Sequence, residues 1–319
     1  MSTATNVPLA SFGLSIGGHG ISTAVDLRKL LSGAQLPALP QSAIRLLELS
    51  QDPDNGPAEF AVPIEVDPGL TGQVLKFVNS SYFGFSREIS SVKLAITLVG
   101  IRTIKNFALW SAVFSLMPNP KCGPFDLKGL WQDSLRRGLF ARMIGKLLGL
   151  KEAEDVFAGA LLQDMAVPLL AKELSKEYAE LLVARGKGTG RLSEFEQQRF
   201  GWNHGEAAGM LARIWNLPEA FAALIERHTA LEALIADSSS TPGHLAVALS
   251  ALLPSASDER WHEWPQFEAA YRAILKSDTP TIEQALAKTD AQFVEFAPLM
   301  KLATPAKSLL DMYRSVTGA

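Results

Sequence analysis

Cysteine is nearly absent from this sequence, whose 319 residues include only one, Cys122. A single cysteine excludes an internal disulfide and any zinc site built from several thiolates, and it suits a reducing cytoplasm. Cys122 lies in the Pro/Gly-rich stretch PNPKCGPF, with no histidine nearby in sequence. We therefore interpret it as an incidental loop thiol and not as a nucleophile.

The sequence also lacks an excess of basic charge. Its formal net charge is −3 at pH 7 and its pI is about 6.0. Nucleic-acid-binding proteins usually gather an excess of Lys and Arg on one surface. Nucleic acid is therefore not an expected partner, although total charge does not test for a local basic strip.

Long hydrophobic runs and a secretory signal are missing as well. The longest apolar run, LAVALSALL at 245–253, is about half of the roughly 20 residues that a membrane-spanning helix needs. The first residues lack the basic start and continuous apolar core of a signal peptide. We expect no membrane span, and the Gly and Ser content predicts a flexible leader over residues 1–30.

The residues that are present predict an all-α protein. Hydrophobic residues make up 47% and charged residues 20%, as in ordinary globular domains. Asp67 is placed to cap a helix with Pro68 in its first turn. Ser90 or Ser91 is placed to cap another helix, which breaks at Gly100 and restarts. No convincing strand pattern of alternating residues accompanies these helices.

The stretch MPNPKCGPFDLKG at 117–129 is the best candidate for a boundary, because it contains three prolines and two glycines. We therefore predict an N-terminal helical lobe over 31–120, a second helical lobe over 121–253 and a C-terminal helical extension over 254–319. The extension carries an aromatic group that we expect to pack on the main body and not to form an exposed partner surface. This group comprises Trp261, Trp264, Phe267 and Tyr271.

Two motifs resemble binding elements and are better explained otherwise. Arg102 and Lys105 follow the helix break at Gly100, as in a DNA-binding helix pair. The alanine of that motif usually lies four residues before the glycine, whereas Ala95 lies five before it, so we predict two packed core helices. ARGKGTGR at 184–191 has no preceding strand and no GK[ST], so we predict a flexible linker and not a phosphate loop.

Several motifs in order make the sequence similar to HDOD domains, which are relatives of the HD and HD-GYP phosphohydrolases. The resemblance covers roughly residues 33–235. It implies an all-α fold in which an N-terminal helical lobe precedes a degenerate HD-like lobe, and it implies a bacterial signalling role. The segments that carry it are LPALPQSAIRLLEL, VDPGLTGQVLKFVNSSYFG, ISSVKLAITLVGIRTIKNFAL, FAGALLQDMAVPLL and FGWNHGEAAGMLARIWNLPEAFAALIERH.

The resemblance also implies a damaged metal site. HD hydrolases hold one or two divalent metals with imidazoles and carboxylates on several helices. Here Asp133 and Ser134 stand where the first histidine is expected, Gln163 replaces the histidine of the His-Asp pair, and Ser250 lies where a later aspartate is expected. The neutral amide of a glutamine is a poor substitute for an imidazole. The implied remnant of the site is Asp133, Gln163, Asp164, His204 and His228.

We therefore predict no bound metal, no catalytic residue and no cofactor. Asp164 is expected to be a buried carboxylate that is hydrogen-bonded to His204, His228 or an arginine, because a buried charge must be paired. His19, His244 and His262 match no metal-ligand spacing.

The function that follows is a non-catalytic signalling or scaffold protein. It would act by contact with other signalling proteins, in motility, stress or cyclic-dinucleotide pathways. Trp202 and Trp215, on either side of His204, would either line a groove between the lobes or serve as core aromatics.

Two alternatives remain. One is a residual metal-dependent phosphohydrolase that uses Asp133, Asp164, His204 and His228. The other is a sensor that binds a nucleotide ligand through Arg136, Arg137 and Lys146.

Overall fold

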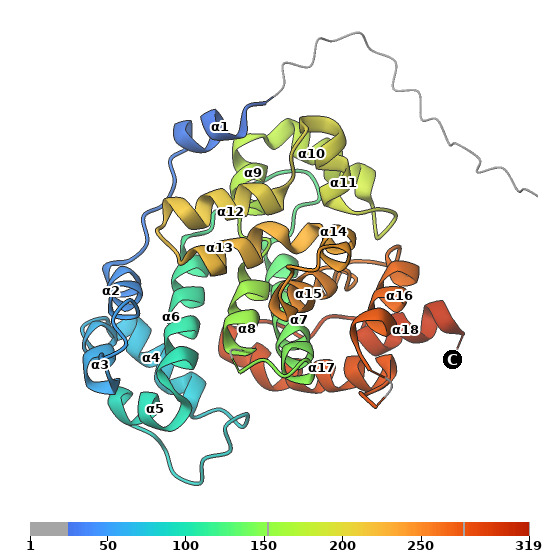
Figure 1. The fold of residues 1–319 in the computed structure, drawn as a ribbon. Helices are drawn as coiled ribbons and strands as arrows, with labels where there is room; N and C mark the ends of the chain where they lie inside the picture. The colour runs from blue at the N-terminus through green and yellow to red at the C-terminus, as the bar shows by residue number, and fades with distance from the viewer. Residues whose placement is uncertain (1–24, 152, 277, 319) are drawn as a thin grey trace, which may run out of the picture.

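The computed structural model describes residues 25–151, 153–276 and 278–318. Throughout these ranges the chain is helical, with eighteen α-helices, two 3₁₀ helices and no strand (Figure 1). The predicted all-α class is confirmed. None of the helices in the described ranges is long and apolar enough to cross a membrane.

The N-terminal lobe consists of five helices that lie at the left of Figure 1. The predicted capping is present, because the Asp67 side chain accepts from Leu70 N and Ser91 Oγ accepts from Leu94 N. Gly100 has φ +94°, which separates two helices in the predicted place. The helices are α2 (Gln41–Leu49), α3 (Pro57–Glu65), α4 (Pro68–Val78), α5 (Val92–Val99) and α6 (Ile101–Leu116).

The second lobe is built around two central helices, α7 and α8, which pack closely. A Cβ at Gly138 on α7 would lie only 2.9 Å from Leu161 Cγ on α8, so glycine permits the close approach. The helices are α7 (Leu127–Leu147), α8 (Ala153–Leu162), α9 (Val167–Glu173), α10 (Ser175–Arg185), α11 (Leu192–Phe200), α12 (His204–Ile214), α13 (Glu219–Glu226), η1 (Arg227–Thr229), α14 (Leu231–Ala236) and α15 (Pro242–Ser250).

The two lobes share a hydrophobic core. The connector at 117–126 joins α6 to α7, yet buried side chains on both sides of it, such as Ile104 and Leu135, belong to one cluster. Cys122 in this connector is buried, and its thiol contacts the Ser175 carbonyl oxygen at 3.1 Å. The lobes are therefore two parts of one packed body.

The C-terminal segment contributes to both lobes. Trp261, Phe267 and Tyr271 are buried in a second cluster with α7, α8 and α15, as expected. Phe296, at the end of α17, instead joins the shared core, and the Arg142 guanidinium carbon lies 5.4 Å from its ring centre. The elements are α16 (Trp264–Ile274), α17 (Ile282–Phe296), η2 (Ala297–Met300) and α18 (Leu309–Thr317).

The predicted flexible leader over 1–30 extends too far. Residues 1–24 lie outside the described residues, but a helix, α1 (Leu27–Gly33), follows them. Asp26 caps α1, and Leu27 and Leu31 are buried. The helix contacts α12, and Val25 O accepts a hydrogen bond from Trp202 Nε1 at 2.6 Å. Residues 25–30 are thus held by packing that the Gly/Ser-rich composition did not indicate.

Candidate functional site

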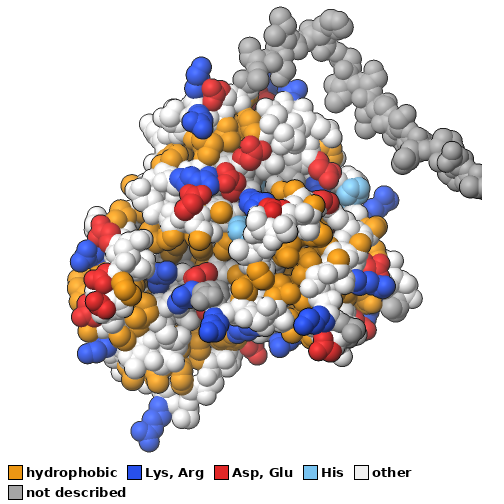
Figure 2. Space-filling view, viewed as in Figure 1, with side chains coloured by type: hydrophobic (Ala, Val, Ile, Leu, Met, Phe, Trp, Pro, Cys, Tyr) orange, Lys and Arg blue, Asp and Glu red, His pale blue; other side chains and the backbone are white. Residues whose placement is uncertain are grey.

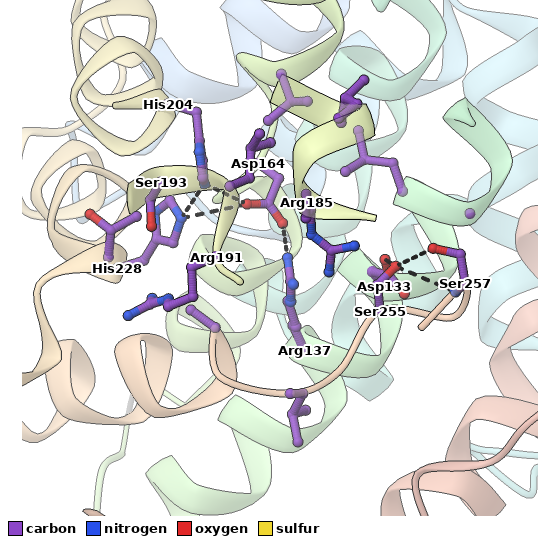
Figure 3. A pocket seen from close by; sticks show the side chains of 18 of the residues that line it. Asp133, Arg137, Asp164, Arg185, Arg191, Ser193, His204, His228, Ser255 and Ser257 are labelled. Atoms are coloured by element: carbon purple, nitrogen blue, oxygen red, sulfur yellow. Dashed lines mark hydrogen bonds and ion pairs between the residues drawn. The ribbon is translucent and has the colours of Figure 1, made fainter. Parts of the chain in front are cut away.

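Four of the five predicted HD-type residues, all except Gln163, line a cavity of about 150 Å³ in the second lobe (Figure 3). Residues from α7, the end of α10, the starts of α11 and α12, η1 and the loop after α15 line this cavity. Its polar lining includes Asp133, Arg137, Asp164, Arg185, Arg191, Ser193, His204, His228, Ser255, Ser257 and Glu263. Positive and negative side chains therefore face the same small space.

Asp164 is at the centre of the cluster. It lies in the turn between α8 and α9, and its side chain is only 5% exposed. Arg137, on α7, donates to Asp164 Oδ2 through a guanidinium nitrogen. Burial alone would raise the pKa of Asp164, but the charge of Arg137 and a hydrogen bond from His204 hold it well below its usual range. Asp164 is therefore an ionised, paired carboxylate.

His204 lies between two carboxylates. It is the first residue of α12, where Asn203 forms the helix cap. Its Nδ1 is 2.6 Å from Glu196 Oε2, and its Nε2 is 3.2 Å from Asp164 Oδ1. Burial lowers the pKa of His204, yet the charge of Glu196 and the hydrogen bonds with both carboxylates outweigh this effect and raise the pKa to about 9. His204 is therefore protonated at neutral pH.

His228 has the opposite character. Its Nδ1 is 2.6 Å from Ile225 O, so this nitrogen carries the proton and donates it to the carbonyl. Its Nε2 lies 3.1 Å from His204 Nε2 and accepts a hydrogen bond from the protonated His204 ring. Burial lowers the pKa of His228, which is consistent with a neutral ring. A neutral histidine thus accepts from a charged one.

Small residues on α12 allow the two histidines to approach. A Cβ at Gly205 would lie 2.8 Å from Glu226 O, and one at Gly209 would lie 2.6 Å from Glu226 Cβ. Larger side chains at these positions would push α12 away from the end of α13 and from His228 in η1. The stretch HGEAAG at 204–209 therefore supplies His204 and also the glycines that let α12 pack close to α13 and η1.

Protein cations compete with a metal ion for the carboxylates of this cluster. The donor atoms of Asp164, His204 and His228 lie within 4.8 Å of one another, which is close enough to meet on one ion. To bind a metal through Nε2, however, His204 would have to give up the proton at that atom, and the two neighbouring carboxylates favour the protonated ring. Asp164 also forms an ion pair with the Arg137 guanidinium. Protein cations thus occupy the positions in which a metal would balance the carboxylate charge.

The other implied remnants lie apart from this cluster. Gln163 is fully buried, does not line the cavity, and neither of its amide atoms has a hydrogen-bond partner among the described residues. Asp133 lies beyond Arg185 in Figure 3 and accepts from Ser255 Oγ at 2.5 Å and from Ala256 N at 2.6 Å. Ser250 is buried and donates to Val247 O.

Several charged residues of the site, among them Glu196, Arg185 and Arg191, were not predicted. Glu196 binds His204 and also accepts from the Tyr178 hydroxyl. Arg185 pairs with both oxygens of Asp258 at 2.7 and 2.8 Å, and Arg191 is buried at the cavity wall. The two arginines stand on either side of the three glycines of ARGKGTGR. These glycines were the sequence feature that could have directed attention to both arginines.

The ARGKGTGR segment packs against the chain after α15, in contrast to the predicted flexible linker. Lys187 O accepts from Glu259 N at 3.0 Å. Gly188 has φ +84°, and a Cβ there would lie 2.1 Å from Arg260 O. The glycine is required by a close backbone approach, so the loop forms a fixed wall of the cavity.

The two tryptophans occupy different surroundings. Trp202 is buried beneath α1 and stacks on Phe200 at a ring distance of 4.8 Å. Trp215 is also mostly buried, but it lines a surface groove of about 550 Å³ together with residues 36–39, Ile44, Leu47, Glu48, Gln51, Ile214 and Asn216. The groove lies between the lobes, and only Trp215 of the pair lines it.

The three residues of the predicted nucleotide site do not come together. Arg137 lines the cavity, whereas Arg136 donates to Lys307 O and lies over the Phe293 ring. Lys146 is exposed near the other end of α7. Arg136 and Lys146 therefore do not add to the charge around Arg137 in the cavity.

Comparison with known proteins agrees with this architecture. The HDOD domain model matches residues 36–231. An uncharacterised protein of Treponema pallidum is 24% identical over 205 residues, which are 60% of this chain and 37% of that protein. The chain thus matches little more than a third of that relative's length.

Three solved structures share the fold. An HDOD domain protein of unknown function from Geobacter sulfurreducens has a TM-score of 0.68 at 23% identity, covering 87% of this chain and 97% of that one. A "putative phosphohydrolase" from Shewanella amazonensis has a TM-score of 0.59 at 18% identity, with 93% and 96% covered.

A "putative signal transduction protein" from Marinobacter aquaeolei also has a TM-score of 0.59, at 17% identity, with 86% of this chain and 63% of that one covered. At these identities the likeness concerns the fold. Because the family model matches more than half of the chain, in the region that contains the Asp164, His204 and His228 cluster, this protein belongs to the HDOD domain family.

Proposed function

We propose that this protein is a signalling protein that acts by binding other proteins and does not hydrolyse phosphate esters. The observation that carries the proposal is the charge balance at Asp164. Arg137 and protonated His204 neutralise Asp164 and Glu196 without a metal. Membership of the HDOD family and the fold shared with a "putative signal transduction protein" support the signalling role.

A partner surface for this role is the groove that Trp215 lines. Leu36, Leu39, Ile44 and Leu47 form much of its wall, and Ile214 is 48% exposed at its edge. The groove joins α2 to the end of α12, so a bound partner would contact both lobes. This arrangement would let contact on one lobe influence the other.

The decisive test measures metal content and phosphodiesterase activity together. Protein purified without chelator is incubated with manganese, iron or zinc, desalted and analysed by elemental mass spectrometry, and its hydrolysis of bis(p-nitrophenyl) phosphate is measured. We expect less than stoichiometric metal and no hydrolysis above background. Stoichiometric metal with hydrolysis, both lost in Asp164→Asn, would refute the proposal.

A gain-of-binding variant sharpens this test. Gln163→His restores the His-Asp pair, and Arg137→Gln removes the competing cation. If the charge balance explains the absence of a metal site, the double variant should bind more metal than the wild type and more than either single variant. Equal metal content in all four proteins would show that Arg137 and Gln163 do not control metal binding.

The second candidate is a residual metal-dependent phosphohydrolase. It is favoured by the grouping of Asp164, His204 and His228 within 4.8 Å. Asp133 is not part of that group and is held by the 255–256 loop, so this hypothesis now rests on three residues and not four. The same metal and hydrolysis measurements separate it from the first proposal.

A nucleotide sensor is the least supported of the three functional hypotheses. Each cavity arginine faces a carboxylate: Arg137 faces Asp164, Arg185 faces Asp258, and Arg191 is influenced by Glu263. A cavity of about 150 Å³ is also small for a nucleotide. Saturable nucleotide binding that weakens with salt and is lost in Arg137→Gln would revive this hypothesis.

A further inference from the structure

A second cavity, separate from the HD-type site, lies where the two lobes meet. Its volume is about 350 Å³, within the range of roughly 300–1,000 Å³ typical of small-molecule sites. Helices α2 and α6 of the N-terminal lobe form one side, and α8, α13 and the start of α15 form the other. On the face seen in Figure 2, basic, acidic and hydrophobic side chains adjoin beside α6.

The walls of this inter-lobe cavity are mainly apolar. Leu47 and Leu109 come from the N-terminal lobe, and Val156, Phe221 and Leu224 come from the second lobe. Such a lining favours an aliphatic or aromatic body over a sugar or a nucleotide, because polar groups would lose their hydration without gaining partners.

Two side chains at this apolar cavity have nitrogen atoms without a hydrogen-bond partner among the described residues. Lys105, on α6, forms no ion pair or hydrogen bond with the described residues, and burial lowers its pKa. His244, on α15, is 2.8 Å from the Thr241 hydroxyl through Nδ1, while its Nε2 has no partner within the described ranges. In the tautomer in which the Thr241 hydroxyl donates to Nδ1, Nε2 carries the ring proton and is an N–H donor.

Among the described residues, the charges near the cavity leave a single positive charge without a partner. Asp155 lines the cavity, but Arg102 donates to its Oδ2 at 2.6 Å and Asn106 donates to its Oδ1 at 2.8 Å. Lys105 is the remaining cation. Arg227 and Asp237, which both influence His244, pair with each other at 3.0 Å.

From these observations we propose that the inter-lobe cavity binds a small carboxylic acid with an apolar body. One carboxylate oxygen would accept from Lys105 Nζ and the other from His244 Nε2, while the apolar body lies among the leucines and Phe221. A monoanion matches the single unpaired charge. Because the two donors belong to different lobes, the bound acid would connect the N-terminal lobe to the second lobe. This site is independent of the charge balance at Asp164.

The test is titration calorimetry of the full-length protein with octanoate and, as a neutral match in chain length, 1-octanol. We expect saturable binding of one octanoate per chain and weaker binding of octanol. Lys105→Met keeps the length of the side chain and removes its charge. It should lower octanoate affinity roughly tenfold or more, the size expected for a charge-assisted contact, and leave octanol affinity unchanged.

Two further variants serve as controls. Lys93→Met removes an exposed lysine from α5, outside the cavity, and should bind octanoate like the wild type. Ala220→Trp adds a large ring at an exposed position of the cavity lining and should weaken both octanoate and octanol. Circular dichroism confirms that each variant is folded.

Three results would overturn the proposal. They are no saturable octanoate binding to the wild type, equal affinity for octanoate and octanol, and unchanged octanoate affinity in folded Lys105→Met. None of them bears on metal or hydrolysis, so failure here is distinguishable from failure of the proposed signalling role.

Discussion

The HD-type cavity and the inter-lobe cavity differ in whether their charged side chains have partners of opposite charge. In the first, Asp164, Arg137, His204 and Glu196 satisfy one another, and Arg185 is held by Asp258. In the second, Lys105 faces apolar walls without a partner among the described residues. A buried charge that is fully paired contributes to specifying the fold, whereas a half-buried charge without a partner is available to a ligand. The charged cluster around Asp164 is therefore less available to a ligand than Lys105 is.

The strongest challenge to this comparison is removal of Asp164. Asp164→Asn leaves Arg137 and protonated His204 buried without their shared carboxylate, so we expect a loss of about 3–5 kcal/mol of unfolding free energy. Asp155→Asn is the matched control, because its carboxylate is 33% exposed and its pair with Arg102 should contribute at most about 1 kcal/mol. Urea unfolding measures both. The comparison fails if Asp164→Asn costs no more than Asp155→Asn.

The pH dependence of stability tests whether His204 is charged in the folded protein. Its pKa rises from 6.5 to about 9, so the protonated form is favoured by folding. That stabilisation is complete below pH 6.5 and is lost as pH rises through 9, at up to about 1.4 kcal/mol per pH unit. Urea unfolding at pH 6 and pH 9 measures it. Glu196→Gln should flatten the dependence, and an unchanged slope in that variant would contradict the assignment.

The wall of the HD-type cavity offers a smaller test. Gly188→Ala combines a positive φ with a Cβ only 2.1 Å from Arg260 O, so we expect a loss of about 1–3 kcal/mol as the loop moves. Gly149→Ala has a similar φ of +78° with nothing within 4 Å, and isolates the backbone strain at about 1 kcal/mol. Thermal unfolding that gives equal losses would show that the close contact is not rigid.

The smallest expected effect is in the inter-lobe cavity. Lys105→Met removes a cation that has no partner in the described ranges, so unfolding free energy should change by less than about 1 kcal/mol, in either direction. Arg137→Met, an equivalent change in the HD-type cavity, should cost several-fold more because it leaves Asp164 without its guanidinium. Similar losses in the two variants would remove the distinction between paired and available charge.

Helix ends were predictable because their causes are local. Asp67 caps Leu70 N, Ser91 caps Leu94 N, and Gly100 supplies a positive φ, all within a few residues of the position concerned. The need to pair a buried charge predicted that Asp164 would contact a histidine or an arginine, and in the structure it contacts both. Composition was a weaker guide at the N-terminus, since α1 is held by contacts with α12 far along the chain.

By itself, then, the sequence determined the helical class, the capped helix starts and the set of polar residues from which the site is drawn. Only the tertiary structure decided which charges meet. Arg137 and Asp164 are 27 residues apart, Arg185 and Asp258 are 73 apart, and Lys105 and His244 lie on different lobes. The physical reason is range: a cap acts within one helical turn, whereas a buried ion pair or a cavity exists only after distant helices have packed.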